Sequence, residues 1–406
     1  MTTTAVLAAL GGLLLLAFVA NRLFNLTRVP DILVLISVGV ILGPLTGIVH
    51  ANQFQGLTHS LGTLALVLIL FEGGLELRMR ETIQHFPAGV LLSVLAYFLS
   101  ILLVSAGAHW LLHFPWLVSL LAGAALGCAS GSVVLPVLQQ LNASQNLKVP
   151  LVLEAAFGDV LGVTTVTILL RFRQHSQHLV ATVLLHEGLR MLASVVVPVL
   201  AGAGWSRLAR RLSEERFWQS LTFSFVLLLY AGTQAVLHNG LLAVLTFGLT
   251  LANLPGFDIF AADSGLDFQS EHPEHHVEIL NFHSELAFLV RTFFFVLLGA
   301  IVQFAGLRGY LRLMAVTALA LIVARFIALQ AASLVWHGID PREKEIAFWL
   351  LPRGLITAVL ALQIFDAGGQ AFQFLPALAF AIIIITNALV VVGIWRTHEP
   401  AGSRQT

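Results

Sequence analysis

Long apolar stretches alternate with short polar segments along the whole chain. A helix needs about 20 apolar residues to cross a bilayer, and by this criterion the sequence predicts about thirteen membrane spans. Their approximate limits are residues 4–22, 29–48, 58–76, 87–112, 115–141, 150–171, 180–205, 217–238, 240–256, 284–304, 308–336, 343–364 and 371–396. The ninth stretch is short and the fourth and fifth have indistinct limits, so twelve and fourteen spans stay open. The pattern predicts an all-α polytopic membrane protein.

The amino-acid composition also indicates a membrane protein. Hydrophobic residues make up 58% of the chain and charged residues 10%, whereas soluble domains carry about 25% charged residues. The formal net charge of zero gives no reason to expect a nucleic-acid partner. Cys128 is the only cysteine, so an intramolecular disulfide is excluded. No basic segment precedes the apolar run at residues 5–20, which is therefore expected to be a retained first helix.

Arginine and lysine predict the orientation of the chain, because these residues concentrate in cytoplasmic loops. Loops after odd-numbered spans, together with the tail, hold thirteen of them, and loops after even-numbered spans hold four. We therefore expect the amino terminus outside and the carboxyl terminus in the cytoplasm. A bacterial inner membrane is the expected location.

Two carboxylates, Glu154 and Asp159, interrupt the apolar span at residues 150–171. A carboxylate at the bilayer centre costs about 2.5–3.5 kcal/mol on insertion scales, so it is expected to face a protein interior or a wet cavity and to mark an ion or proton path. Five residues at about 100° each place the two side chains roughly 140° apart. They are therefore expected to serve separate roles.

Two spans contain signals for a break in the helix. Span five has Ser130-Gly131-Ser132 followed by a proline, and span twelve has Pro352-Arg353-Gly354. Proline removes a backbone donor and glycine weakens a helix. The two breaks lie in spans that are seven apart, and an odd offset reverses the direction through the membrane, so the two segments are expected to run in opposite directions. Paired broken helices in corresponding halves are typical of transporter sites.

Four segments, in chain order, together resemble the sodium/proton exchanger branch of the monovalent cation:proton antiporter superfamily. They are Leu-Phe-Glu-Gly-Gly-Leu-Glu-Leu at residues 70–77, the Glu154 to Asp159 segment, Phe-Phe-Phe-Val-Leu-Leu-Gly at 293–299 and Leu-Pro-Arg-Gly at 351–354. The resemblance implies an antiporter fold with inverted repeats and two crossing broken helices. It also implies a homodimer that works by alternating access.

The resemblance further implies a division of the chain into domains. Residues 87–171 and 305–396 would form the core, with helices 4–6 and 11–13. An interface domain would comprise residues 1–86 (helices 1–3) and 217–304 (helices 8–10), and linker helix 7 would lie at 172–216. A short cytosolic tail would follow at 397–406.

Roles for individual residues also follow from the resemblance. Asp159 would bind a cation and a proton in turn, while Glu154 and Arg353 would form a buried ion pair that steadies the core. Hard cations prefer oxygen ligands, and from the residues themselves Ser130 and Ser132 are candidates beside Asp159, although serines also commonly bond their own helix backbone. Glu72 either lines the access path or sits at a helix end. No cofactor, and no metal beyond the transported cation, is expected.

The sequence departs from the family pattern at two places. Gly158 replaces the polar residue that precedes the family's aspartate, and Ala129-Ser130-Gly131 aligns with a Thr-Asp-Pro of the fifth helix. The serine-rich segment resembles the potassium-efflux branch instead. On the overall resemblance, Na⁺ or Li⁺ is the favoured cation for exchange with H⁺, and K⁺ is the competitor because the fifth-helix aspartate is absent. With Asp159 as the one site carboxylate and Gly158 beside it, the exchange is expected to be electroneutral and one-for-one.

Two other classes of function are alternatives to cation/proton exchange. A transport-inactive sensor or scaffold would explain the two lost polar positions. A membrane enzyme is not favoured, because we see no His-x3-His pair in a span and no nucleophile motif. The acidic, histidine-rich segment at 257–283 is interpreted as a solvated loop, with metal binding or pH sensing as the alternatives.

Overall fold

The structure is a computed structural model of the 406-residue chain. It describes residues 11–12, 14–19, 22, 30–47, 55–76, 79–141, 143–174, 180–212, 217–253, 274–301, 309–336 and 338–397. These residues are almost entirely helical, which confirms the predicted all-α class. Eight of the described helices are long and apolar enough to cross a membrane, and shorter apolar helices lie between them.

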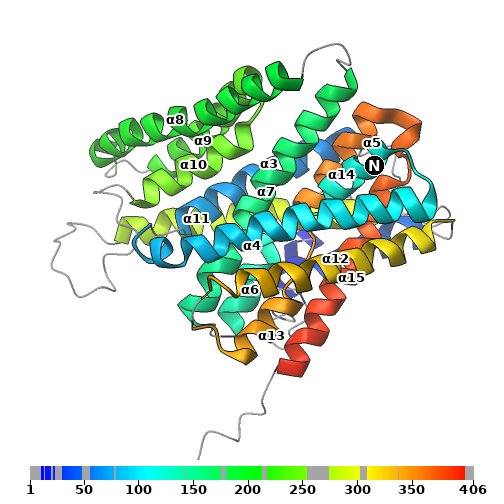
Figure 1. Ribbon diagram of the computed structural model, residues 1–406. Helices are drawn as coiled ribbons and strands as arrows, with labels where there is room; N and C mark the ends of the chain where they lie inside the picture. Colours follow the sequence, from blue (N-terminus) through cyan, green and yellow to red (C-terminus); the bar gives the residue numbers. More distant parts are fainter. Residues whose placement is uncertain are drawn as a thin grey trace, which may run out of the picture. The chain divides into compact units, whose positions relative to one another are not determined.

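The helices follow the predicted spans in order (Figure 1). The α-helices are α2 (Asp31–Val40), α3 (Gln55–Glu76), α4 (Met79–Ala106), α5 (Trp116–Leu126), α6 (Gly131–Gln140), α7 (Gln145–Gln174), α8 (Val180–Leu212), α9 (Trp218–Leu237), α10 (Gly240–Asn253), α11 (Glu274–Ile301), α12 (Leu311–Ala332), α13 (Pro341–Trp349), α14 (Leu355–Gly368) and α15 (Leu375–Thr397). Short π-helical turns η1 (Ile41–Leu45) and η3 (Gly107–Leu111) extend α2 and α4, and the 3₁₀ turn η6 (Gly369–Phe372) follows α14.

Both predicted helix breaks are present in the structure. The chain leaves the helix between α5 and α6, at residues 127–130, and again between α13 and α14, at residues 350–354. We call these segments the first and the second break. They meet directly, because the Ser130 amide donates to the Pro352 carbonyl over 2.8 Å. Each break thus supplies a partner for a backbone group that the other leaves outside a helix.

The described chain divides into two compact units. One comprises residues 1–62, 85–170 and 291–406, and the other residues 63–84 and 171–290. In the first unit, α15 packs against α12, α13 and α14, and α5 contacts α14. In the second unit, α8, α9 and α10 pack side by side (Figure 1). The first unit contains both breaks and the helix that carries Glu154 and Asp159. The core and interface assignment made from the sequence stays a prediction.

Each unit contains a close helix crossing built on a pair of glycines. In the first unit, a Cβ added at Gly39 of α2 would overlap the Val296 carbonyl of α11, and one at Gly299 would overlap the Ile36 carbonyl. In the second unit, Gly74 of α3 and Gly248 of α10 approach each other in the same way. Small residues allow such contacts between backbones, which bind helices together in lipid.

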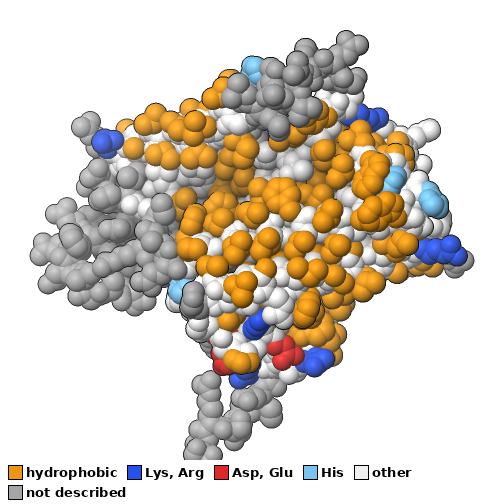
Figure 2. Space-filling model, viewed as in Figure 1, with side chains coloured by type: hydrophobic (Ala, Val, Ile, Leu, Met, Phe, Trp, Pro, Cys, Tyr) orange, Lys and Arg blue, Asp and Glu red, His pale blue; other side chains and the backbone are white. Residues whose placement is uncertain are grey.

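The surface carries large apolar side chains that soluble proteins would bury. Examples are Leu15, Leu200, Leu228 and Leu334, each at least two-thirds exposed. On the face seen in Figure 2, apolar side chains cover much of the described surface, and charged ones gather near the ends of α13 and α15. This distribution suits contact with lipid and agrees with the predicted membrane protein.

Candidate functional site

Asp159 lies in the interior of the first unit, on α7. Its side chain is only 6% exposed, and its Oδ1 has no hydrogen-bond partner in the protein. Buried polar atoms nearly always have a partner, which can be a water molecule or an ion. The free oxygen of Asp159 therefore marks a place for a proton, a water molecule or a cation.

The helix face next to Asp159 packs against the first break. A Cβ added at Gly158 would lie 3.8 Å from the Ala129 backbone nitrogen, and one at Gly131 would lie 3.5 Å from the Ala155 Cβ. One turn further along α7, a Cβ at Gly162 would overlap the Cys128 sulfur. Small residues on α7 thus bring the break against the turn that carries Asp159. The glycine that replaces the family's polar residue at position 158 is part of this contact.

Side chains of α15 hold the second break. Thr386 accepts a hydrogen bond from the Arg353 amide over 3.0 Å, and Asn387 donates from Nδ2 to the Arg353 carbonyl over 2.8 Å. Both α15 side chains are fully buried. The polar pair within the apolar last span therefore satisfies the backbone of the interrupted helix.

The ion pair predicted between Glu154 and Arg353 is corrected by the structure. Glu154 of α7 pairs with Arg325 of α12, and both side chains are more than nine-tenths buried. Arg325 also donates to the Ala347 carbonyl over 2.6 and 3.0 Å and to the Leu350 carbonyl over 2.9 Å. The guanidinium thereby caps the carboxyl end of α13, where carbonyls lack helical partners and carry partial negative charge. This cap orients the remaining nitrogen towards Glu154.

Arg353 is still part of the candidate site, although its ion pair with Glu154 is not formed. Its side chain is buried and its Nε has no hydrogen-bond partner. Its charge interacts with those of Asp159, Glu154 and Arg325. Arg353 and Asp159 are therefore parts of one electrostatic cluster in the first unit.

The remaining predicted site residues have different outcomes. Ser130 is buried in the first break, where its amide makes the bond to Pro352. The side chain of Ser132 and most of the 257–283 segment lie outside the described residues. Glu72 belongs to the second unit and accepts a hydrogen bond from Ser284 of α11. Its assignment to an access path stays a prediction.

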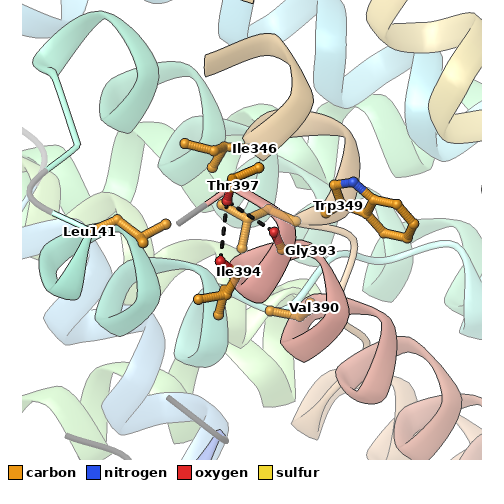
Figure 3. A pocket seen from close by; sticks show the side chains of 8 residues that line it. Leu141, Ile346, Trp349, Val390, Gly393, Ile394 and Thr397 are labelled. Carbon is orange, nitrogen blue, oxygen red and sulfur yellow. Dashed lines mark hydrogen bonds between the residues drawn. The ribbon is translucent and has the colours of Figure 1, made fainter. Parts of the chain in front are cut away.

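A small apolar pocket lies elsewhere in the first unit (Figure 3). It is lined by side chains at the end of α6 and on α13 and α15, namely Leu141, Ile346, Trp349, Leu350, Val390, Gly393, Ile394 and Thr397. Its polar side-chain groups are the Trp349 indole N–H and the Thr397 hydroxyl, which is bonded to the Gly393 and Ile394 carbonyls of its own helix. The pocket contains none of the predicted site residues.

Arg325 is the partner of Glu154 that sequence reasoning missed. The available signal was a single arginine in an otherwise apolar span, which demands a buried partner. Four arginines lie within predicted spans and away from the span ends, at 190, 291, 325 and 353, and spacing cannot choose among them. Arg291, for example, pairs with Asp31 of α2 over 2.9 Å.

Comparisons with known proteins bear on the family and the fold of the chain. The profile of the family described as sodium/hydrogen exchanger, transmembrane, matches residues 13–396. The chain is 24% identical over 370 residues to Na(+)/H(+) antiporter 1 of Methanocaldococcus jannaschii, which covers 87% of this chain and 82% of that protein. It is also 24% identical over 385 residues to the K(+)/H(+) antiporter NhaP of Alkalimonas amylolytica, across 93% of this chain and 63% of that protein.

A solved structure shares the fold. The sodium proton antiporter MjNhaP1 from Methanocaldococcus jannaschii, determined at pH 8, superposes with a TM-score of 0.77 at 21% identity, over 97% of this chain and 96% of that chain. The predicted antiporter fold is thus confirmed.

Proposed function

The chain belongs to the sodium/hydrogen exchanger family, so that it is a monovalent cation/proton antiporter and not an enzyme, and we propose that Asp159 is the carboxylate that carries either ion. One observation carries this proposal. Asp159 is buried beside the first break and one of its oxygens has no partner within the protein. A proton or a cation would satisfy that oxygen, and one carboxylate cannot hold both.

The oxygen atoms around Asp159 suit a hard monovalent cation. Carbonyls of the first break and the hydroxyls of Ser130 and Ser132 are the proposed further ligands. Arg353, which interacts with Asp159, would balance the carboxylate charge while neither ion is bound. Sodium is the favoured cation, with lithium as a second substrate.

A potassium/proton antiporter is the second candidate. The first break carries Ala129-Ser130-Gly131 and no carboxylate of its own. With fewer charged ligands, discrimination against the larger, more easily dehydrated potassium ion is expected to be weaker. Relatives similar to this chain bear names of both sodium/proton and potassium/proton antiporters.

The proposed transport cycle is alternating access with one cation exchanged for one proton. A single site carboxylate that alternates between two singly charged ions moves no net charge. Exchange is therefore electroneutral in this proposal. The protein would work as a homodimer in the inner membrane, with the amino terminus outside and the carboxyl terminus in the cytoplasm.

Proteoliposomes that enclose a pH-sensitive dye test the function. Addition of Na⁺, Li⁺ or K⁺ to the wild-type protein is expected to move protons, and Asp159→Asn is expected to abolish the response. Asp366→Asn is the matched control, since Asp366 is an exposed aspartate on α14. An active Asp159→Asn variant would remove this residue from the mechanism. A rate that follows an imposed membrane potential would contradict electroneutral exchange.

Competition for one carboxylate also sets the pH dependence. Protons occupy Asp159 more as the pH falls, so the apparent KM for the cation is expected to rise, by at most about tenfold per pH unit. The maximal rate should change less than KM. A KM that does not depend on pH would show that the two ions use separate sites.

A further inference from the structure

Thr357 is a fully buried threonine in the first turn of α14. Its Oγ1 has no hydrogen-bond partner in the protein. Other helical threonines of this chain, such as Thr167, Thr250 and Thr386, donate to the carbonyl four residues earlier. An unsatisfied hydroxyl in the interior costs free energy and needs a partner that the protein itself does not supply.

The second break explains why this hydroxyl has no backbone acceptor. The carbonyl four residues before Thr357 belongs to Arg353, which lies in the second break and outside the helix, so it is not aligned with the Thr357 hydroxyl as in a regular helical turn. The carbonyl of Gly354, three residues before, accepts the Ala358 amide. The break thus leaves the Thr357 hydroxyl available to another ligand.

Helix geometry places Thr357 at the level of Asp159. Leu360 of α14 lies against Gly162 of α7, since a Cβ added at Gly162 would be 3.3 Å from the Leu360 Cδ1. On the span count predicted from the sequence, the two helices belong to spans six and twelve, which are both even-numbered and therefore run in the same direction. Asp159 precedes Gly162 by three residues, and Thr357 precedes Leu360 by three. At 1.5 Å per residue, both lie about 4.5 Å along the helices from that contact.

We propose that the Thr357 hydroxyl is a further oxygen ligand of the cation carried at Asp159, an inference that rests on the exchange function proposed above. A hydroxyl offers lone pairs to a hard cation and adds no charge. The single negative charge of Asp159 therefore still decides between proton and cation. Binding would satisfy two buried oxygens that the protein alone leaves without partners.

Thr357→Val tests this role, because valine has nearly the same shape and no hydroxyl. In proteoliposomes the apparent KM for the cation is expected to rise about tenfold, with a maximal rate within about twofold of wild type. Thr357→Ser keeps the hydroxyl and is expected to retain the wild-type KM. Thr317→Val is the matched control, since Thr317 of α12 is equally buried and its Oγ1 also lacks a partner.

The outcomes separate this inference from the proposed function. Wild-type protein that exchanges cations for protons, together with a Thr357→Val variant whose KM is within about twofold of wild type, overturns the Thr357 assignment alone. The same holds if Thr317→Val raises KM as much as Thr357→Val, or if Thr357→Ser behaves like the valine variant. Wild-type protein that exchanges no cation overturns both proposals. Thermal unfolding checks each variant, and Thr357→Ala replaces the valine variant if valine prevents folding.

Discussion

The two breaks look alike in the sequence but are held in different ways. At the second break, the carboxyl end of α13 is capped by the Arg325 guanidinium, and the backbone of Arg353 is bound by Thr386 and Asn387. At the first break, the Ala124 carbonyl near the end of α5 has weaker donors, the Tyr97 hydroxyl at 3.4 Å and the Cys128 thiol at 3.8 Å. One helix end thus has a permanent cation, and the other does not.

This difference suggests that the two breaks have different functions. Helix carboxyl ends carry partial negative charge that a cation stabilises. Arg325 supplies that cation permanently at α13, which suits a scaffold. At α5 no arginine or lysine is bonded to the helix end in the described residues, and Asp159 lies close to the same break. A transported cation would fill there the role that Arg325 fills at the second break.

Removal of Arg325 should have the largest effect on stability. Arg325→Ala leaves Glu154 buried without its partner and uncaps α13, which is expected to cost about 3–5 kcal/mol. Arg325→Lys keeps the charge but cannot reach Glu154 and both carbonyls at once, so an intermediate loss is expected. Thermal unfolding in detergent measures both. An Arg325→Ala variant as stable as wild type would show that this cap is dispensable.

Loss of either α15 side chain should loosen the second break less. Thr386→Val and Asn387→Ala each remove one bond to the Arg353 backbone and leave a buried polar group unsatisfied, at about 1–3 kcal/mol. Thr250→Val is a control, because Thr250 donates to its own helix and has no bond to a break. Equal losses in Thr386→Val and Thr250→Val would show that the bond to Arg353 contributes nothing.

Crowding at the first break should impair transport with a smaller cost to stability. The Cβ of Gly162→Ala would overlap the Cys128 sulfur, and such overpacking costs about 1–3 kcal/mol, less if Cys128 rotates away. The exchange rate is expected to fall because the break is displaced from Asp159. Cys128→Gly combined with Gly162→Ala should restore activity. Failure of the double variant to recover would place the defect elsewhere.

The smallest effect is expected at the surface pair of Arg396 and Glu345. Their nitrogen and oxygen are 3.7 Å apart, and the side chains are 65% and 44% exposed. Glu345→Gln is expected to change stability by about 0.5 kcal/mol or less and to leave exchange unchanged. A larger loss that disappears at high salt would show that charges outside the two breaks also hold α13 and α15 together.

The length of the apolar stretches and a few special residues predicted much of the fold. Apolar length gave the spans in order, because backbone groups in lipid must be satisfied within helices. Glycine, serine and proline marked both breaks, since these residues weaken or interrupt a helix. The sequence also predicted that Glu154 and Asp159 of span six face the protein interior, because an unpaired charge in a membrane interior is costly, and both are buried in the structure.

The pairing of Glu154 could not be predicted in the same way. Glu154 and Arg325 are 171 residues apart in sequence, and Arg353 was an equally charged alternative on a neighbouring span. Sequence shows that a buried glutamate needs a cation, but it does not show which helix faces it. Arg325 is the partner because the free carbonyls at the carboxyl end of α13 and the Glu154 carboxylate together offer its guanidinium several acceptors.

The sequence by itself therefore determined the class of the protein, the position of its breaks and the two carboxylates in its interior, since these follow from local composition and the cost of polar groups in lipid. Tertiary structure decided which arginine neutralises Glu154, which side chains hold the second break and which polar atoms stay without partners. Those outcomes depend on contacts between segments that are distant in the chain, and the local sequence does not show which helices become neighbours.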